Sequence, residues 1–310
     1  MAKEIMNFVQ VNGEVVDVYG EKIVNEGESY ERYEFMMKVK TDEDNVRDVK
    51  FSCNTKTAKG EESSKYKGFI TIFDEIKTIA ENEKGDRISL SCKVTNNAYY
   101  SKGVFYEKPE LVVDFANREK NGKRYEDNAS FSVYAYIEDV IETKDGLLDF
   151  KCLVNEYKTT RSIKGHELIF KVLDKDLVED FKSTYKKGDV AQLEGLIKDV
   201  KIKVEVPEEK LVELEVKGVG SARQKIIEEN ARRKEMRENG VYETEMVLEL
   251  TGGYDTYTPE QCEELEYPYS NEDIDDMLDK IDELLDKSKA RDQKKNPGSY
   301  DSINDEDVPF

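Results

Sequence analysis

The segments KGDRISLSCKV, residues 84–94, and KGDVAQLEGLI, residues 187–197, decide the fold. Each begins with a Lys-Gly-Asp turn and continues with alternating apolar and polar residues, the two-residue period of a strand with one buried face. In the first segment the inward residues are Ile88, Leu90, Cys92 and Val94. The same turn and strand at two places in the chain predict an internal repeat of one β-rich unit.

Three strands and a segment with helical spacing precede each turn. In the first unit we expect strands at 8–18, 33–40 and 46–53, a helix at 70–80, and strands at 87–94 and up to 111–115. In the second unit we expect strands at 130–142, 147–157 and 167–173, a helix at 174–185 and a strand at 190–197. Five strands with a helix between the third and the fourth resemble the oligonucleotide/oligosaccharide-binding (OB) fold.

The sequence therefore predicts a mainly β protein with two tandem OB-fold barrels and a C-terminal helical or disordered acidic tail. The expected domains are 1–119, 128–257 with a projecting helix near 221–239, and a tail at 258–310. Residues 200–217 could form a hairpin around Pro207. Whether 241–257 completes the second barrel stays open at this point.

Composition restricts the chemistry that the chain can perform. Its single histidine, His166, is interpreted as a solvated structural residue, and the four cysteines are scattered without the spacing of a zinc site. A P-loop motif is absent from the sequence. We therefore expect no enzyme activity, no cofactor and no metal. The apolar runs are too short for a membrane span or a signal peptide, so a cytoplasmic location is expected.

The acidity is concentrated at the C-terminal end. The 310 residues carry a formal net charge of −21, and nearly half of it lies in residues 261–310, with 6 basic and 16 acidic side chains. Exposed charges separated by more than about 10 Å are largely screened at physiological salt. A basic surface on the folded part could therefore still bind a polyanion.

The last ten residues, DSINDEDVPF, carry the most specific signal. Acidic residues followed by Val-Pro-Phe resemble the tip of bacterial single-stranded DNA-binding proteins. This resemblance covers only the tip, and the tandem units look more like a phage-encoded member. It implies non-specific binding of single-stranded DNA in replication, recombination and repair, and recruitment of partner proteins such as a helicase, primase, polymerase or nuclease. The expected partner-binding residues are Asp305, Glu306, Asp307, Val308, Pro309 and Phe310.

Candidate DNA-binding residues follow from the alternation of side chains along each strand, because cations contact phosphates and flat rings stack on bases. Tyr33 and Phe35 fall on the inward side and are interpreted as core residues. In the first unit the outward candidates are Lys38, Lys50, Arg87 and Lys93, and the hairpin tip adds Tyr99, Tyr100 and Lys102. In the second unit they are Tyr134 and Tyr136, joined by residues of the second and third strands and their connecting loop: Lys151, Tyr157, Lys158, Arg161 and Lys164.

Two alternatives stay open. The chain could instead be an OB-fold adaptor that captures host replication proteins through its tip, without strong DNA binding of its own; a hydrolase lacks any recognisable group of catalytic residues. The acidic helix expected at 271–287 could dock on the chain's own barrels, bind a partner's groove or mediate self-association. Residues 288–300 are expected to be disordered.

Overall fold

The computed structural model describes residues 7–27, 31–43, 45–119, 125–156, 164–204, 206, 212–216 and 221–296. These residues form two units. One contains the chain up to Lys198 together with the chain from Leu248 onward, and the other contains Asp199–Val247. The tip at 305–310 and the candidates Tyr157, Lys158 and Arg161 lie outside the described residues.

Five strands from the N-terminal part of the chain close into a ring that we call the first barrel. Its members are β1 (Asn7–Val24), β2 (Arg32–Lys40), β3 (Val46–Asn54), β7 (Pro109–Arg118) and β4 (Arg87–Asn96), in this spatial order. All neighbours are antiparallel except β3 and β7, and β4 returns to β1. The short strands β5 (Tyr99–Ser101) and β6 (Val104–Tyr106) lie between the last two barrel strands in sequence and form a separate hairpin. Helix α1 (Ser64–Glu75) lies between the third and fourth strands in sequence. The predicted OB-like order is therefore present in this barrel.

A second ring repeats this order and is called the second barrel. Its strands are β8 (Asn128–Glu142), β9 (Leu148–Asn155), β10 (Gly165–Val172), β12 (Val241–Tyr257) and β11 (Val190–Val204), with α2 (Val178–Thr184) before β11. Strand β12 is the parallel partner of β10, with Leu248 opposite Phe170. At Gly195 of β11 a Cβ atom would lie 1.8 Å from the Glu249 carbonyl oxygen, so the close approach of β11 and β12 requires glycine.

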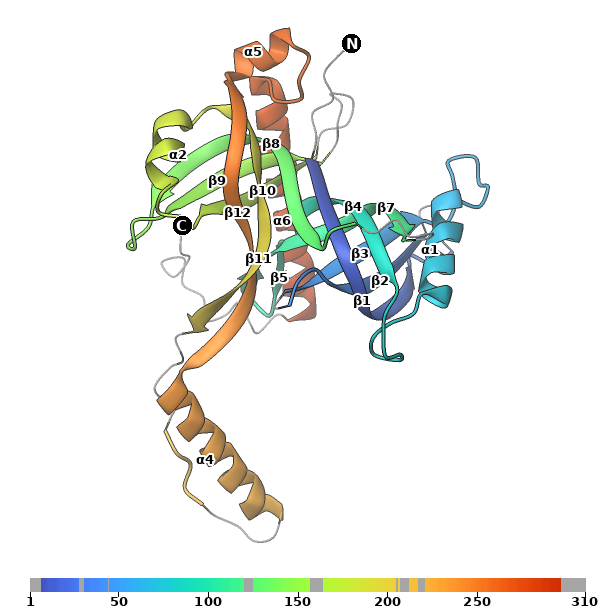
Figure 1. The fold of residues 1–310 in the computed structure, drawn as a ribbon, viewed down its shortest axis with the longest axis vertical. Coiled ribbons are helices and arrows are strands. Elements are labelled where there is room, and N and C mark those ends of the chain that lie inside the picture. Colours follow the sequence, from blue (N-terminus) through green and yellow to red (C-terminus); the bar gives the residue numbers. More distant parts are fainter. Residues whose placement is uncertain are drawn as a thin grey trace. The chain divides into compact units, whose positions relative to one another are not determined.

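The two barrels share one sheet. Strands β1 and β8 pair antiparallel, with Val9 opposite Phe131 and Val11 opposite Ala129, which gives one ten-stranded sheet (Figure 1). In this view α1 lies beside the first barrel on the right and α2 beside the second on the left. The first barrel, and the second barrel up to Lys198 and from Leu248 onward, belong to one compact unit. The division into separate domains 1–119 and 128–257 stays a prediction.

Aromatic rings fill the first barrel. Phe35 stacks on Phe51 with centroids 4.3 Å apart, and Phe69 of α1 meets Phe51 edge-on at 4.8 Å. Tyr33 and Phe35 are buried, as predicted. The helix, however, ends at Glu75 and does not span 70–80. The amides of Ile79 and Ala80 donate to carbonyl oxygens of β1, so pairing with the strand replaces further helical turns.

Helices α5 (Pro259–Glu264) and α6 (Asn271–Lys295) cover part of the second barrel. Ile274 and Met277 of α6 are buried with Leu153 and Val190, so the apolar stripe docks on the chain's own strands. The prediction of disorder from 288 onward is wrong for residues 288–295, which continue the helix. Within the described residues, no helix has the length and apolar character that a membrane crossing requires.

The compact unit Asp199–Val247 consists of the C-terminal part of β11, the N-terminal part of β12, helix α4 (Ser221–Asn239) and the segment 212–216. The Asn230 side chain of α4 both donates to the Leu214 carbonyl oxygen, at 2.8 Å, and accepts from its amide, at 2.7 Å. Gly240, with φ +77°, ends the helix in the left-handed conformation that favours glycine. The predicted helix at 221–239 is thus present.

Candidate functional site

A short hairpin in the connection between β4 and β7 carries four aromatic side chains. It is built from β5 (Tyr99–Ser101) and β6 (Val104–Tyr106), joined by Lys102 and Gly103 with φ of +52° and +79°. Positive φ at both turn residues matches the twist of the strands. The register places Tyr99 opposite Tyr106 and Tyr100 opposite Phe105, which gives one ring pair on each face of the hairpin.

The Tyr99–Tyr106 pair forms a flat, accessible aromatic surface. The ring centroids lie 5.6 Å apart at 20°, and the residues are 41% and 46% exposed. Exposed, nearly parallel rings of this kind can stack on planar ligands. Sequence reasoning selected Tyr99 and Tyr100 but missed Phe105 and Tyr106, although hairpin register around the Lys-Gly turn could have identified them.

The opposite ring pair faces α6. Tyr100 and Phe105 lie 5.3 Å apart, and Phe105 lines a cavity of about 160 Å³ together with His166 of β10 and Ile281 and Leu285 of α6. The amide of Tyr100 donates to the Ser288 Oγ atom at 3.0 Å. The helix side therefore half-buries Tyr100, whereas Phe105 on the same face is 41% exposed, as much as Tyr99.

Three first-barrel cations that the sequence selected are bound by carboxylates. Lys50 pairs with Glu110 at 3.3 Å, Lys93 pairs with Glu156 at 2.7 Å, and Arg87 bonds Asp127 and Glu119. The hydrogen bond to Asp127 is the main cause that raises the pKa of Arg87. Lys38 differs, since its Nζ atom lies 5.4 Å from the centre of the Tyr19 ring. A phosphate would have to compete with these carboxylates.

Glu156, the residue directly after β9, contacts three basic side chains. His166 and Lys164 contact its Oε2 atom at 3.1 and 2.6 Å, and Lys93 reaches it from the first barrel. Burial raises the pKa of Glu156, but the three hydrogen bonds outweigh burial and hold the pKa well below its usual value. His166 is buried rather than solvated, which corrects the sequence interpretation.

Among the described second-barrel candidates, Tyr134 and Tyr136 are partly covered by the C-terminal segment. Tyr134 and Tyr136 pack against the buried cluster of Tyr267, Tyr269 and Met277. Lys151 pairs with Glu167 at 2.7 Å and with Glu138 at 3.7 Å. The coverage could not be anticipated, because it depends on how the C-terminal helices dock.

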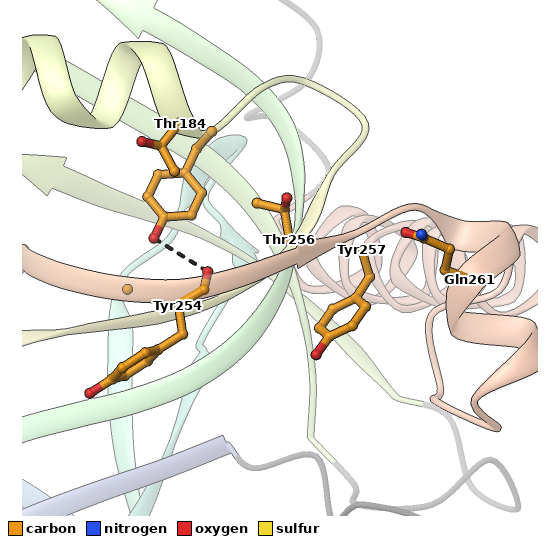
Figure 2. Close-up of a pocket in the computed structure, with 7 residues that line it drawn as sticks. Thr184, Tyr254, Thr256, Tyr257 and Gln261 are labelled. Atoms are coloured by element: carbon orange, nitrogen blue, oxygen red, sulfur yellow. Dashed lines mark hydrogen bonds between the residues drawn. The ribbon is translucent and has the colours of Figure 1, made fainter.

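A separate hollow of about 570 Å³ lies at the junction of α2, β12 and α5 (Figure 2). Tyr185 donates a hydrogen bond to the Tyr254 carbonyl oxygen at 3.4 Å, and the rings of Tyr254 and Tyr257 lie on the same side of β12. Its lining is uncharged, so it offers no cation for a phosphate: Thr184, Tyr185, Gly253, Tyr254, Thr256, Tyr257 and Gln261. Among the described residues, no three His, Cys, Asp or Glu side chains come together as a metal site.

Comparisons with known proteins give one family and distant structural similarities. The family model described as YorF matches residues 6–291. No curated protein matches the chain. Similar solved structures include the wild-type single-stranded DNA binding protein from Thermus aquaticus, at 13% identity and TM-score 0.39, covering 64% of this chain and 87% of that chain. A deletion mutant of that protein gives 13%, 0.37, 64% and 88%. TM-scores below 0.5 carry no inference about function.

Proposed function

The chain belongs to the YorF family, and we propose that it binds single-stranded DNA without sequence specificity. The observation that carries the proposal is the exposed Tyr99–Tyr106 pair on the hairpin between the fourth and fifth strands of the first barrel. In OB folds this connection is one of the loops that bind oligonucleotides. A planar base can stack on these rings whatever its identity, because every base has a π-face.

The proposed binding surface extends from this hairpin over the outward residues of the first barrel. Lys102 supplies a cation at the turn of the hairpin and Lys38 supplies one at the Tyr19 ring of β1. Lys50, Arg87 and Lys93 contribute only if DNA phosphates displace their carboxylate partners. Each ion pair that is broken in this way lowers the net binding free energy gained from the new phosphate contact. We therefore expect affinity to depend more on stacking than on charge, with a shallow dependence on salt.

A fluorescence anisotropy titration with labelled oligo-dT of about 30 nucleotides tests the proposal. Tyr99→Ala and Tyr106→Ala should each weaken binding by about tenfold, since stacking contributes about 1–3 kcal/mol per base. Tyr125→Ala is the matched control, because Tyr125 is 43% exposed but lies outside the hairpin. Duplex DNA of the same length should bind much more weakly.

Equal effects of all three substitutions would contradict stacking on the hairpin. Failure of the wild-type protein to bind oligo-dT at low salt would contradict the proposed function itself. The carboxylate pairing of Lys93, Lys151 and Arg87 favours the second candidate, an adaptor that contacts proteins rather than DNA. In that case a peptide ending in the DEDVPF sequence of residues 305–310, not oligo-dT, should compete for the partner.

Roles in replication, recombination and repair, a phage origin, and recruitment through residues 305–310 belong to the same proposal and stay predictions. The ring of Phe310 fits an apolar pocket, and Asp305 and Asp307 fit a basic rim. Deleting residues 305–310 should abolish capture of replication proteins and leave oligo-dT affinity within about twofold, because the proposed stacking surface lies on the hairpin at 99–106.

A further inference from the structure

The turn of the aromatic hairpin holds an anion in this structure. The backbone amide of Lys102 donates to Asp292 Oδ1 at 3.0 Å, and the amide of Gly103 donates to Oδ2 at 2.8 Å. Both turn residues have positive φ, so their successive amides point to the same side. Successive amides in a turn conformation form concavities that bind anionic oxygens.

Asp292 reaches this turn from the C-terminal end of α6. The residues of α6 that face the hairpin are apolar at first and polar in the last two turns. Ile281 and Leu285 line the cavity beside Phe105, whereas Ser288 and Asp292, one and two turns further on, hydrogen-bond the hairpin backbone. Asp292 is only 6% exposed. The described contacts of the last two turns with the hairpin are thus polar, and polar contacts with few buried apolar groups open most readily.

The C-terminal end of α6, which reaches the turn, is rich in basic residues, in contrast to the acidity of the chain as a whole. Residues 287–295 contain five exposed basic side chains: Lys287, Lys289, Arg291, Lys294 and Lys295. The Nζ atom of Lys289 lies 5.8 Å from the centre of the Tyr100 ring. Lys287 pairs with Glu283 at 2.9 Å, and cations in the last turn complement the helix dipole, so Lys289 is the basic side chain that the described contacts place against the hairpin.

We propose that the amides of Lys102 and Gly103, with Lys289 near the neighbouring Tyr100 ring, form a phosphate site for the DNA backbone, and that Asp292 occupies it when DNA is absent. A carboxylate and a phosphate both present a pair of anionic oxygens to two donors. The site lies at the turn of the hairpin whose strands carry Tyr99 and Tyr106, so a base on the rings and its phosphate at the turn belong to one strand. The inference rests on the proposed function.

Competition between Asp292 and DNA has a measurable consequence. The apparent affinity is proportional to the fraction of molecules whose site is free. Removing the competing carboxylate raises that fraction and therefore tightens binding. Asp292→Asn should lower the Kd for oligo-dT by about fivefold at physiological salt. The matched control is Asp286→Asn, which removes the same charge from an exposed position of α6. The control should change the Kd by less than about twofold.

Equal effects of Asp292→Asn and Asp286→Asn, or weaker binding by Asp292→Asn, would overturn the inference. A second measurement is independent of DNA binding: inorganic phosphate is titrated into ¹⁵N-labelled Asp292→Ala protein. The amide signals of Lys102 and Gly103 should shift in that variant and stay in place in the wild type. Absence of a shift overturns the phosphate site, whereas a shift without oligo-dT binding by any variant would instead contradict the proposed function.

Discussion

His166 and Glu156 make the stability of the molecule sensitive to acid. Burial lowers the pKa of His166, although the Glu156 carboxylate acts in the opposite direction. A lowered histidine pKa means that the unfolded chain binds the proton more tightly, so the stabilising contribution is present above about pH 6.5 and is lost as the pH falls. Glu156, whose pKa is also lowered, adds a further loss below its usual value of 4.5.

We predict that the urea midpoint falls between about pH 7.5 and about pH 5.5 in the wild-type protein and falls less in His166→Asn. The comparison is direct because His166 is the only histidine of the sequence. The measurement is urea denaturation followed by circular dichroism at both pH values. An identical pH response of the two proteins would show that His166 is not the group responsible.

At the scale of elements, α1 stabilises the first barrel by closing its core with Phe69. This side chain is 4% exposed and meets both Phe51 and Phe35 edge-on. Phe69→Ala should lower the free energy of unfolding by about 3–5 kcal/mol, because the transfer and cavity costs add. Thr71→Ala, on the exposed side of the same helix, should stay within about 0.5 kcal/mol. Urea denaturation distinguishes the two outcomes.

The local sequence pattern predicted the strands well. It predicted less well where the helices end and which barrel residues the C-terminal helices cover. Alternation along β4, with Ile88 and Leu90 inward, depends on one strand and its core, which neighbouring residues encode. The end of α1 and the helical continuation through 288–295 depend instead on hydrogen bonds to distant segments, β1 and the hairpin. No local period encodes such contacts.

The same distinction applies to the candidate site. The outward direction of Lys93 follows from strand parity, but its pairing with Glu156 joins residues of two barrels. Tyr99 could be selected from the sequence. The role of Tyr106 in the aromatic surface depends on the β5–β6 register, which places it opposite Tyr99. The covering of Tyr134 by the Tyr267 cluster required the docked C-terminal helices.

At the scale of the whole molecule, the shared sheet should couple the two barrels. β1 belongs to the first barrel and pairs with β8 of the second over Asn7–Asn12. We predict that Phe69→Ala, made in the first barrel, also speeds hydrogen exchange of the amides of Leu168 and Phe170 in β10. Exchange that changes only in β1 to β7 would instead support the independent domains 1–119 and 128–257.

The pairing of β1 with β8 has a consequence for behaviour on dilution. The two strands are the first strands of their barrels, so the contact has the form of an interface between two equivalent protomers, made within one chain. Only residues 119–127 separate the end of β7 from the start of β8. A short connection gives an effective concentration of about millimolar. The two barrels therefore remain joined at nanomolar protein, where a comparable pair of separate chains would dissociate.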